Sequence, residues 1–593
     1  MLQRLRKPLP YMRLGTGLGI LALLSVNASS VYALFNHASD RDLLVVFFQI
    51  TVICGLSFAI HYLSLSTKFP SFVVAIFFGL VAQPLLNPII SHPDSMGALV
   101  GIGATMILFG GGLETPLRNF RKLFWKINSL SFIGLFLTAL LLSYVTWYFG
   151  WWVGTPISVM AAILLGSALA STDPAAIIPV LKYLRFNNRE TKDIIVAESA
   201  LTDVTGSLLT IMFLSLLSGG VVVATIWQGY QSLFTIEALE LLVKEVFFGL
   251  LFGGLGYLLL ELLLRLKQRS RREYGVDAAF FIFVPMISFT AAVAFGGSGY
   301  LAAFIAGLLF SMTEKLQDTE HFFNHTVDGF MKPVIFLLLG TLVDLRSLID
   351  YAALGIGAAF VFMFIIRPLT VWISLGPTIF FKKNGLTWRE IWFISSVRET
   401  GAIPAMLLVT IVSMNIGNLE GLVAVGMWII LATLVIQPPL TPVIANWLKI
   451  GTPIKEDDEG ELHLNGSDAF VVLGSRGHSH QKRLPYVIDW AARRGIGKVV
   501  LLLCLEDDYS PESFKELEAE AIKQFETINQ EREAAGQVAI KFSIVGRSGF
   551  LQENIDAIAS TENNVIAIFV GRKVLDYRLS EIKRLAVPLF FLD

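Results

Sequence analysis

Charge is the scarcest property of this sequence. Only 16% of its 593 residues are Asp, Glu, Lys or Arg, whereas soluble globular proteins carry about 25%. Cysteine is scarce as well: Cys54 and Cys504 lie in dissimilar segments and exclude a disulfide framework. Apolar residues make up 54% of the chain, and the mean hydropathy is +0.66. These values exclude an ordinary soluble protein and predict one that crosses the membrane many times.

Apolar stretches of about 20 residues mark the expected transmembrane helices. We expect about fourteen, near 14–35, 43–64, 70–90, 97–113, 127–148, 154–180, 193–217, 241–265, 276–296, 298–313, 326–346, 352–380, 389–413 and 419–447. The segment 218–240 is expected to be a long outer loop or an interfacial helix. The first stretch follows a basic N-terminus and resembles a signal peptide, but we expect it to remain as an uncleaved span.

Lysine and arginine are distributed unevenly among the loops. The basic loops lie near 115–126, 182–192, 265–272 and 382–389. The loops that hold almost no basic residue are 36–42, 91–96, 149–153, 218–240 and 414–418. Since basic loops face the cytoplasm, this pattern predicts a multi-pass protein of the cell (inner) membrane with both termini cytoplasmic.

The sequence changes character after the last apolar stretch. We expect a transmembrane domain over 1–448, an acidic linker over 449–466 and a cytoplasmic α/β domain over 467–593. Apolar runs typical of buried strands fall at 468–474, 498–505, 538–545, 565–570 and 587–592, and amphipathic helices near 481–495, 511–535, 549–560 and 575–585. Their alternation predicts a parallel or mostly parallel sheet.

Three carboxylates lie within apolar segments: Asp173, Glu198 and Asp203. A charge in mid-membrane costs about 2.5–3.5 kcal/mol on insertion scales, so three of them close in sequence indicate a function. We expect them to bind a cation or a proton. Pro174 follows Asp173; a proline removes a backbone donor and forces the preceding residue out of the helical conformation. The helix should therefore break here, with carbonyl groups available to a cation.

Helical geometry separates the carboxylates of the next span. Ser199 and Asp203 are four residues apart and share a face, whereas Glu198 and Asp203 point about 140° apart. One face thus offers a hydroxyl with a carboxylate, and the other a carboxylate that needs a cationic partner. Arg367 is the first candidate for that partner, and Arg398 is the second.

Seven motifs occur in a recognisable order. They are Phe-Pro-Ser-Phe at 69–72, Leu-Phe-Gly-Gly-Gly-Leu-Glu at 108–114, Ser-Thr-Asp-Pro at 171–174, Glu-Ser-Ala-Leu-Thr-Asp at 198–203, the glycine-rich run at 296–307, Phe-Leu-Leu-Leu-Gly at 336–340 and Arg-Pro-Leu at 367–369. With these motifs, residues 43–447 resemble the monovalent cation:proton antiporter family, in particular its NhaP-like and sodium/hydrogen-exchanger branch.

The resemblance implies a fold, a site and a mechanism. The fold would have about 13–14 transmembrane helices in inverted repeats, with two broken crossing helices; Gly401 and Pro404 allow the second break. The resemblance assigns the cation or proton to four residues, Asp203, Asp173, Ser199 and Thr172, and a structural ion pair to Glu198 and Arg367. It also implies alternating access, a homodimer and a role in pH homeostasis.

Two departures from the family pattern affect these expectations. Thr202 stands where the branch has Asn and the electrogenic branch a second Asp. A single titrating carboxylate predicts electroneutral exchange of one proton per cation. In addition, the segment 396–404 replaces the usual Leu-Arg-Gly run, and either Arg398 or Thr400 takes the place of its arginine.

The C-terminal domain resembles universal-stress-like or Rossmann-like domains. Gly474 and Gly477 follow its first expected strand, and Gly546 and Gly549 follow its third. These glycines are weak candidates for holding a nucleotide phosphate at a helix N-terminus. The expected role of the domain is regulation, and no cofactor is assigned with certainty.

The sequence therefore predicts exchange of Na⁺ or K⁺, with Li⁺ as a further candidate, for H⁺ across the membrane. The alternative is a membrane sensor or receptor in which an antiporter-like module signals through the cytoplasmic domain. A cation channel is a second alternative, and its flux would be insensitive to an opposing pH gradient. No enzyme is expected, since nothing in the soluble domain assembles a nucleophile with a base, and no nucleic acid partner is expected.

Overall fold

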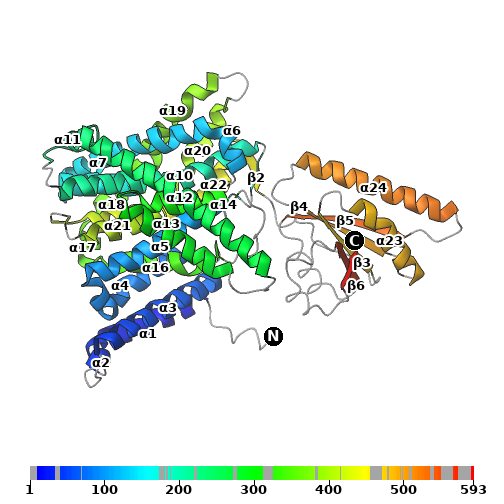
Figure 1. Cartoon of the computed structure of the whole chain (residues 1–593), viewed down its shortest axis with the longest axis horizontal. Helices are drawn as coiled ribbons and strands as arrows, with labels where there is room; N and C mark the ends of the chain where they lie inside the picture. The colour runs from blue at the N-terminus through cyan, green and yellow to red at the C-terminus, as the bar shows by residue number, and fades with distance from the viewer. Residues whose placement is uncertain are drawn as a thin grey trace. The chain divides into compact units, whose positions relative to one another are not determined.

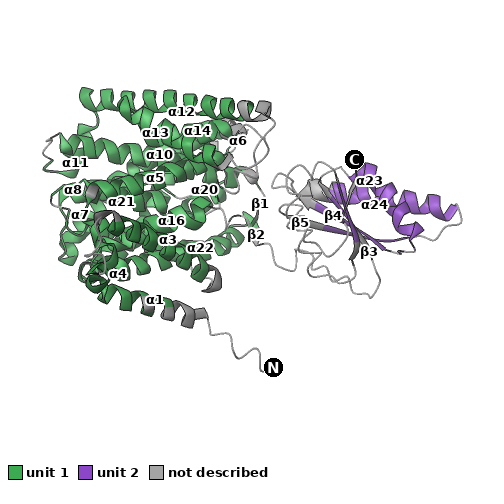
Figure 2. Cartoon of the chain, turned by 60° about the horizontal axis from the view of Figure 1, so that its bottom comes forward, with its two compact units in different colours: residues 1–453 green, residues 454–593 purple. Residues whose placement is uncertain are grey.

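The computed structural model divides the chain into two compact units, Met1–Pro453 and Ile454–Asp593, which are coloured separately in Figure 2. The residues that the structure describes are 10–33, 41–67, 70–115, 117–172, 181, 184–186, 188–219, 223–270, 277–311, 323–324, 326–380, 385–414, 416–417, 419–453, 470–476, 480–494, 496, 498–505, 511–534, 540–548, 565–571 and 589–592.

The first unit is almost entirely helical (Figure 1). Its first half contains α1 (Pro10–Val26), α2 (Ala28–Ala33), α3 (Arg41–Thr67), α4 (Ser71–Ile90), α5 (Pro93–Glu114), α6 (Leu117–Asn128), η3 (Ser129–Gly134), α7 (Leu135–Val153), α8 (Val159–Leu169), α10 (Arg189–Ser218), α11 (Ile226–Ser232) and α12 (Ile236–Ser270). Its second half contains α13 (Asp277–Ala294), α14 (Gly299–Phe310), η4 (Val327–Met331), α16 (Lys332–Thr341), α17 (Leu345–Asp350), α18 (Ala352–Val361), η5 (Phe362–Ile366), α19 (Arg367–Leu375), η6 (Gly376–Phe380), α20 (Trp388–Ser396), α21 (Ala402–Ser413) and α22 (Leu422–Trp447).

These helices confirm the expected multi-pass architecture. Among the described residues, eight helices are long and apolar enough to cross a membrane, and five shorter apolar helices accompany them. In the segment 218–240, the described residues contain the short helix α11 between the end of α10 and the start of α12.

Two helices stop inside the apolar core. α8 ends at Leu169, and the following Ser171 and Thr172 are non-helical and fully buried. The break predicted there is present up to Thr172, whereas 173–180, with Asp173 and Pro174, lie outside the described residues. α20 ends at Ser396, and five buried residues, 397–401, separate it from α21. The second interrupted helix is therefore also confirmed.

Glycines allow α5 and α14 to cross in direct contact. A Cβ atom on Gly112 of α5 would lie 2.4 Å from the carbonyl oxygen of Phe304 in α14. A Cβ atom on Gly307 would lie 2.2 Å from the carbonyl oxygen of Phe109. No larger residue fits at such distances, which is how small residues bring membrane helices together. The crossing holds both helices beside α10.

A small antiparallel sheet extends the first unit beyond α22. Strand β1 (Leu184–Phe186) pairs with β2 (Gly451–Pro453), so that Phe186 lies opposite Gly451. The first unit therefore ends at Pro453. The start of the acidic linker, expected at 449, stays a prediction, and the described residues up to 453 belong to the helical unit.

The second unit contains a five-stranded parallel sheet. Its strands are β3 (Phe470–Arg476), β4 (Lys498–Leu505), β5 (Lys541–Ser548), β6 (Val565–Gly571) and β7 (Leu589–Leu592), in the order β5-β4-β3-β6-β7. All neighbouring strands are parallel, which confirms the α/β prediction. Helices α23 (His480–Arg493) and α24 (Pro511–Ala534) pack apolar residues against the sheet. The helices expected at 549–560 and 575–585 lie outside the described residues.

Candidate functional site

Helix α10 carries most of the candidate residues. It is capped by Asn188, whose side chain accepts a hydrogen bond from the backbone N–H of Glu190 at 3.1 Å, and it runs unbroken through the predicted site. Within it, the exposed fractions of Glu198 and Asp203 are only 2% and 4%. Because the helix is continuous, the two carboxylates point to different neighbours, as the helical period requires.

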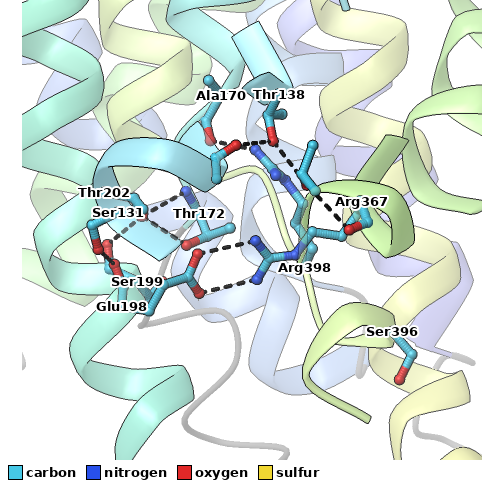
Figure 3. Close-up of polar contacts among 12 residues, drawn as sticks. Ser131, Thr138, Ala170, Thr172, Glu198, Ser199, Thr202, Arg367, Ser396 and Arg398 are labelled. Carbon is cyan, nitrogen blue, oxygen red and sulfur yellow. Dashed lines mark hydrogen bonds and ion pairs between the residues drawn. The ribbon is translucent and has the colours of Figure 1, made fainter. Parts of the chain in front are cut away.

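Thr202 joins α10 to the break after α8 (Figure 3). Its hydroxyl accepts a hydrogen bond from the backbone N–H of Thr172 at 3.3 Å and shares one with the Thr172 hydroxyl at 2.9 Å. It also lies 2.9 Å from the Ser199 carbonyl oxygen, to which it can donate. Thr202, which replaces the family's Asn, therefore satisfies the buried backbone donor that the interrupted helix leaves unpaired.

Two buried hydroxyls in this region remain available to a ligand. The Oγ atoms of Ser171 and Ser199 are fully buried and have no hydrogen-bond partner among the described residues. Burying such a group unpaired costs about 1–3 kcal/mol, so each of these hydroxyls favours a ligand or an ordered water beside it. Hard monovalent cations prefer oxygen ligands of this kind.

Glu198 forms a buried ion pair with Arg367 at the start of α19. The Nη1 and Nη2 atoms of the arginine donate to the two carboxylate oxygens at 3.1 and 3.0 Å. Both side chains are 2% exposed. The bidentate geometry is the strongest that an arginine and a carboxylate form. It engages both oxygens of Glu198, so this carboxylate is not the one that faces the pocket.

Asp203 lines a small pocket on the opposite side of α10. The pocket has a volume of about 20 Å³, enough for roughly one water-sized species. Its lining comes from α5, α10, α14, the segment before α16 and the first residue of α16: Ile107, Leu108, Gly110, Gly111, Glu114, Ala200, Asp203, Phe304, Asn324, Val327, Asp328 and Lys332. An ion that reached Asp203 through this pocket would therefore pass other charged groups.

Glu114 and Asp328 are pocket residues that the sequence analysis missed. Glu114 ends α5, and Asp328 lies 2.6 Å from Lys332 in an ion pair within the pocket lining. With Asp203 they give the pocket three carboxylates and one ammonium group, an excess of negative charge that favours cations. The spacing of Ile107, Gly111 and Glu114 along one face of α5 was the available sequence signal.

Arg398, the second candidate partner for Glu198, instead binds the end of α8. Its Nη2 donates to the carbonyl oxygen of Leu169 at 3.2 Å and to that of Ala170 (Figure 3). Its guanidinium carbon lies 4.5 Å from the centre of the Phe362 ring, in a cation–π contact. A positive charge at the C-terminus of a helix offsets the partial negative charge of its free carbonyl groups.

Thr400 lies two residues further along the second break and pairs with α22. Its backbone N–H donates to the hydroxyl of Thr433 at 3.3 Å, and the Thr433 hydroxyl donates to that of Thr400 at 3.0 Å. Of the two residues left open by the sequence, Arg398 therefore supplies a charge to the first break and Thr400 holds the second one in place.

The weak nucleotide candidates fall on separate strands. Gly474 lies in the central strand β3 and Gly546 in the edge strand β5, with β4 between them. Two strand spacings separate them by about 10 Å, so they do not form one phosphate loop. Gly477 and Gly549 lie outside the described residues. A nucleotide ligand stays a prediction.

A comparison with known protein families decides the class of the chain. The family model described as the transmembrane sodium/hydrogen exchanger matches residues 22–447, which is most of the chain. The chain belongs to the sodium/hydrogen exchanger family. The chain is therefore a multi-pass membrane protein of this family, in agreement with the helices described above.

The relatives of this exchanger include bacterial antiporters. The K(+)/H(+) antiporter NhaP2 of Shewanella sp. (strain MR-4) is 27% identical over 358 residues, which are 60% of this chain and 58% of the relative. The K(+)/H(+) antiporter NhaP of Alkalimonas amylolytica is 25% identical over 409 residues, 68% of this chain and 67% of the relative. The match thus spans less than two thirds of the NhaP2 relative.

A solved structure supports the fold. The sodium proton antiporter MjNhaP1 from Methanocaldococcus jannaschii superimposes with a TM-score of 0.54 at 21% sequence identity. The superposition covers 68% of this chain and 99% of MjNhaP1. The helical unit of the exchanger therefore has the fold of a whole antiporter of this type.

Proposed function

We propose that this exchanger moves a monovalent cation across the membrane in exchange for protons, with Asp203 as the group that binds either ion. The observation that carries the proposal is the position of Asp203, a buried carboxylate on a continuous helix that lines a small, acidic pocket. The names of the relatives point to K⁺ or Na⁺ as the cation.

The same residues suggest how the cation is held. Thr172 and Ser199 lie on either side of the Thr202 hydroxyl, and the buried Ser199 and Ser171 hydroxyls supply oxygen atoms without another partner among the described residues. We assign the cation to Asp203, Ser199 and Thr172. Asp173, which lies outside the described residues, is the fourth proposed ligand. Glu198 and Arg367 support the site without contacting the ion.

Exchange follows from competition between the cation and the proton for Asp203, with Asp173 as a further proposed ligand. A proton on Asp203 removes the charge that attracts the cation, and a bound cation lowers the affinity of the carboxylate for a proton. If only a loaded site changes its access from one side of the membrane to the other, the two fluxes are coupled. We propose that the site opens alternately to the two sides in this way.

The stoichiometry that we propose is one proton per cation. At the position next to Asp203, where a second carboxylate would add a charge, the chain has the uncharged Thr202. Exchange would then be electroneutral. A membrane potential imposed on proteoliposomes should leave the initial rate unchanged, and a rate that follows the potential would exclude this stoichiometry.

Three features of the whole protein are proposed as well. The termini lie in the cytoplasm, since the basic loops lie on that side. The protein is a homodimer, for which the apolar residues exposed along α12 offer a surface; these are Leu239, Val243, Phe247, Leu250, Leu251, Leu255, Leu258 and Leu262. The second unit regulates exchange, so that a chain ending at Pro453 should still exchange ions but respond differently to pH.

Proteoliposomes with an entrapped pH dye test the function directly. We expect the full chain to alkalinise the lumen when an outward gradient of H⁺ meets added K⁺ or Na⁺, and the Asp203→Asn variant to show no exchange. Asp350→Asn is the matched control, because Asp350 is exposed at the end of α17, 4.0 Å from Arg346. Exchange by the Asp203 variant at the rate of the control would refute the assignment.

A further inference from the structure

One wall of the pocket beside Asp203 carries a positive charge that the proposed exchange does not use. Lys332, the first residue of α16, lines this pocket, and its side chain is only 14% exposed. Its Nζ atom lies 2.6 Å from the Oδ1 atom of Asp328, whose side chain is 51% exposed. Because like charges repel, an ammonium group in a pocket that receives cations opposes their entry. Stability alone does not account for it, since an ion pair with an exposed partner contributes little.

The backbone that carries this ion pair departs from a regular α-helix. Pro333 has no N–H group to donate to the preceding turn. The segment before it, η4, is a π-helix, a distortion that occurs frequently at functional sites. The buried hydroxyl of Ser57 in α3 donates to the carbonyl oxygen of Phe330 within η4 at 3.1 Å. The segment that holds the ion pair is therefore fixed to α3.

Glycine contacts fix the same wall of the pocket to α4. A Cβ atom on Gly340 of α16 would clash with the carbonyl oxygen of Ile76. A Cβ atom on Gly79 of α4 would clash with the carbonyl oxygen of Leu337. The two backbones are thus in direct contact, as small residues allow in membrane helices. Asp203 enters the pocket from α10 instead, so the ammonium group and the Asp203 carboxylate line one pocket from separate helices.

The pocket offers oxygen atoms that suit a metal cation and an ammonium group alike. Asn324 lines it, and its buried Oδ1 atom has no hydrogen-bond partner among the described residues. This oxygen would lie 3.1 Å from a Cβ atom on Gly110, so it rests against α5. Glu114 and Asp203 add carboxylate oxygens to the same lining. Because a buried oxygen left unpaired is costly, it favours any cation or donor that reaches it. An incoming cation and Lys332 therefore share the same possible ligands.

We propose that Lys332 is a tethered cation that competes with the transported ion for this pocket and thereby sets the affinity for that ion. Asp328 shares the ammonium group and reduces its hold on the other carboxylates of the lining. Lys332 is a positioning residue in this scheme, because it acts on the ion through the carboxylates and does not contact it. The inference rests on the proposed binding of the ion by Asp203.

The formal charges predict effects of opposite sign for the two members of the ion pair. With its three carboxylates ionised and one ammonium group, the pocket lining has a net charge of −2. Removing the Lys332 charge makes it −3 and should strengthen cation binding. Removing the Asp328 charge makes it −1 and leaves the ammonium group to the remaining carboxylates, which should weaken cation binding. A lysine that only stabilised the helix would not give effects of opposite sign.

The dependence of the exchange rate on cation concentration tests this inference. Initial rates are measured for the full chain in proteoliposomes with an entrapped pH dye, over a range of K⁺ and of Na⁺ concentrations. We expect Lys332→Gln to lower the KM for the cation about fivefold and Asp328→Asn to raise it about fivefold. The double variant should return the KM to within about twofold of the wild-type value, since the net charge is restored. The maximal rate should change much less than the KM, because the variants alter binding.

Two further variants serve as controls. Lys332→Arg keeps the positive charge, so its KM should stay within about twofold of the wild-type value. Lys244→Gln removes one member of an exposed ion pair with Glu240, which has the same spacing of four residues and a distance of 2.7 Å but lies outside the pocket lining. It should leave the KM unchanged. The thermal unfolding temperature of each variant is measured first, and Asp328→Asn decides alone if Lys332→Gln does not fold.

The outcomes separate this inference from the proposed function. If the wild-type chain exchanges ions but the KM is the same in Lys332→Gln and Asp328→Asn, or moves in the same direction in both, the role of Lys332 is overturned and the function stands. If Asp203→Asn exchanges ions at the rate of the wild type, the proposed function fails, and the inference fails with it.

Discussion

The two helix breaks of this exchanger share the same hydrogen bonds but not the same chemistry. In the first, the Thr202 hydroxyl binds the Thr172 backbone N–H at 3.3 Å and the Thr172 hydroxyl at 2.9 Å. In the second, Thr433 binds Thr400 through the same two groups at 3.3 and 3.0 Å. Each supporting threonine also lies 2.9 Å from the carbonyl oxygen three residues before it. The match is what an inverted repeat predicts.

The difference lies in the residues around the supporting threonine. Relative to Thr202, helix α10 has Glu198 four residues before, Ser199 three before and Asp203 one after. At the same offsets from Thr433, α22 has Ile429, Ile430 and Leu434. The hydroxyl pair therefore belongs to the scaffold of both halves, whereas the ionisable groups of α10 have no counterpart at these offsets in α22. In both repeats the buried backbone N–H at the break needs a hydrogen-bond acceptor, but only one repeat needs side chains that bind an ion.

The second break contributes to the first through Arg398. This side chain leaves the segment 397–401 and binds the carbonyl oxygens of Leu169 and Ala170 at the end of α8. The free carbonyl oxygens at the first helix break thus accept hydrogen bonds from the guanidinium group of Arg398, which belongs to the second break. The two breaks are held together, so a change in one is expected to be felt in the other.

The largest effect is expected from the ion pair that has no counterpart in α22. Glu198→Gln or Arg367→Met alone leaves a buried charge unpaired, which typically costs about 3–5 kcal/mol. Each variant should therefore lower the thermal unfolding temperature strongly in detergent. The double variant, which has neither charge, should recover much of the lost unfolding temperature. If the double variant unfolds at as low a temperature as the less stable of the two single variants, the paired role is contradicted.

A smaller loss is expected when the connection between the two breaks is removed. Arg398→Met removes the one charged donor group, Nη2, that the two buried carbonyl oxygens share, and a hydrogen bond to a charged group is worth about 1.5–3 kcal/mol. We expect a lower unfolding temperature and slower exchange, with Arg398→Lys in between. Arg346→Met serves as the control, since Arg346 is exposed. Exchange at the wild-type rate in Arg398→Met would show that the breaks act separately.

The hydroxyl pairs Thr172–Thr202 and Thr400–Thr433 allow a matched test of a structural role against a role in ion binding. Thr202→Val and Thr433→Val each leave a buried backbone N–H unpaired, at a cost of about 1–3 kcal/mol. Their unfolding temperatures should fall by similar amounts, whereas the affinity for the cation in the exchange assay should fall more for Thr202→Val. Equal effects on affinity would mean that the second break also takes part in binding.

The smallest effect is expected for Thr202→Asn, which restores the family's usual residue. The Asn side-chain oxygen can still accept a hydrogen bond from the Thr172 backbone N–H, so stability should change by less than about 1 kcal/mol. The rate with K⁺ relative to Na⁺ is the quantity to measure. An inactive Thr202→Asn variant would show that the rest of the site has adapted to threonine.

Much of the architecture could be predicted before the structure. The apolar stretches placed the helices, and the strand runs placed a parallel sheet whose strands start within about three residues of the expected positions. The break near Thr172 followed from Pro174, because proline acts on the backbone locally. The opposite orientation of Glu198 and Asp203 followed from the helical period alone.

Other features could not be predicted, since they depend on contacts between distant segments. The pattern of α5 did not reveal that Glu114 shares a pocket with Asp203, because the crossing of α5 with α14 brings them together. For the same reason the sequence left Arg398 and Thr400 as alternatives. In the structure each has its own partner, one at the end of α8 and one on α22.

The sequence by itself determined that the protein crosses the membrane many times and that Glu198 and Asp203 point to different sides of one helix, because hydropathy and the helical period act within one segment. Helical geometry left both Arg367 and Arg398 as candidate partners of Glu198, the resemblance implied Arg367, and the tertiary structure confirms that this pair forms. Arg367 pairs with Glu198 at 3.0 Å, although 168 residues lie between them in the chain, and Arg398 reaches the end of α8. Such pairings are set by how the helices pack, and packing is a property of the whole fold.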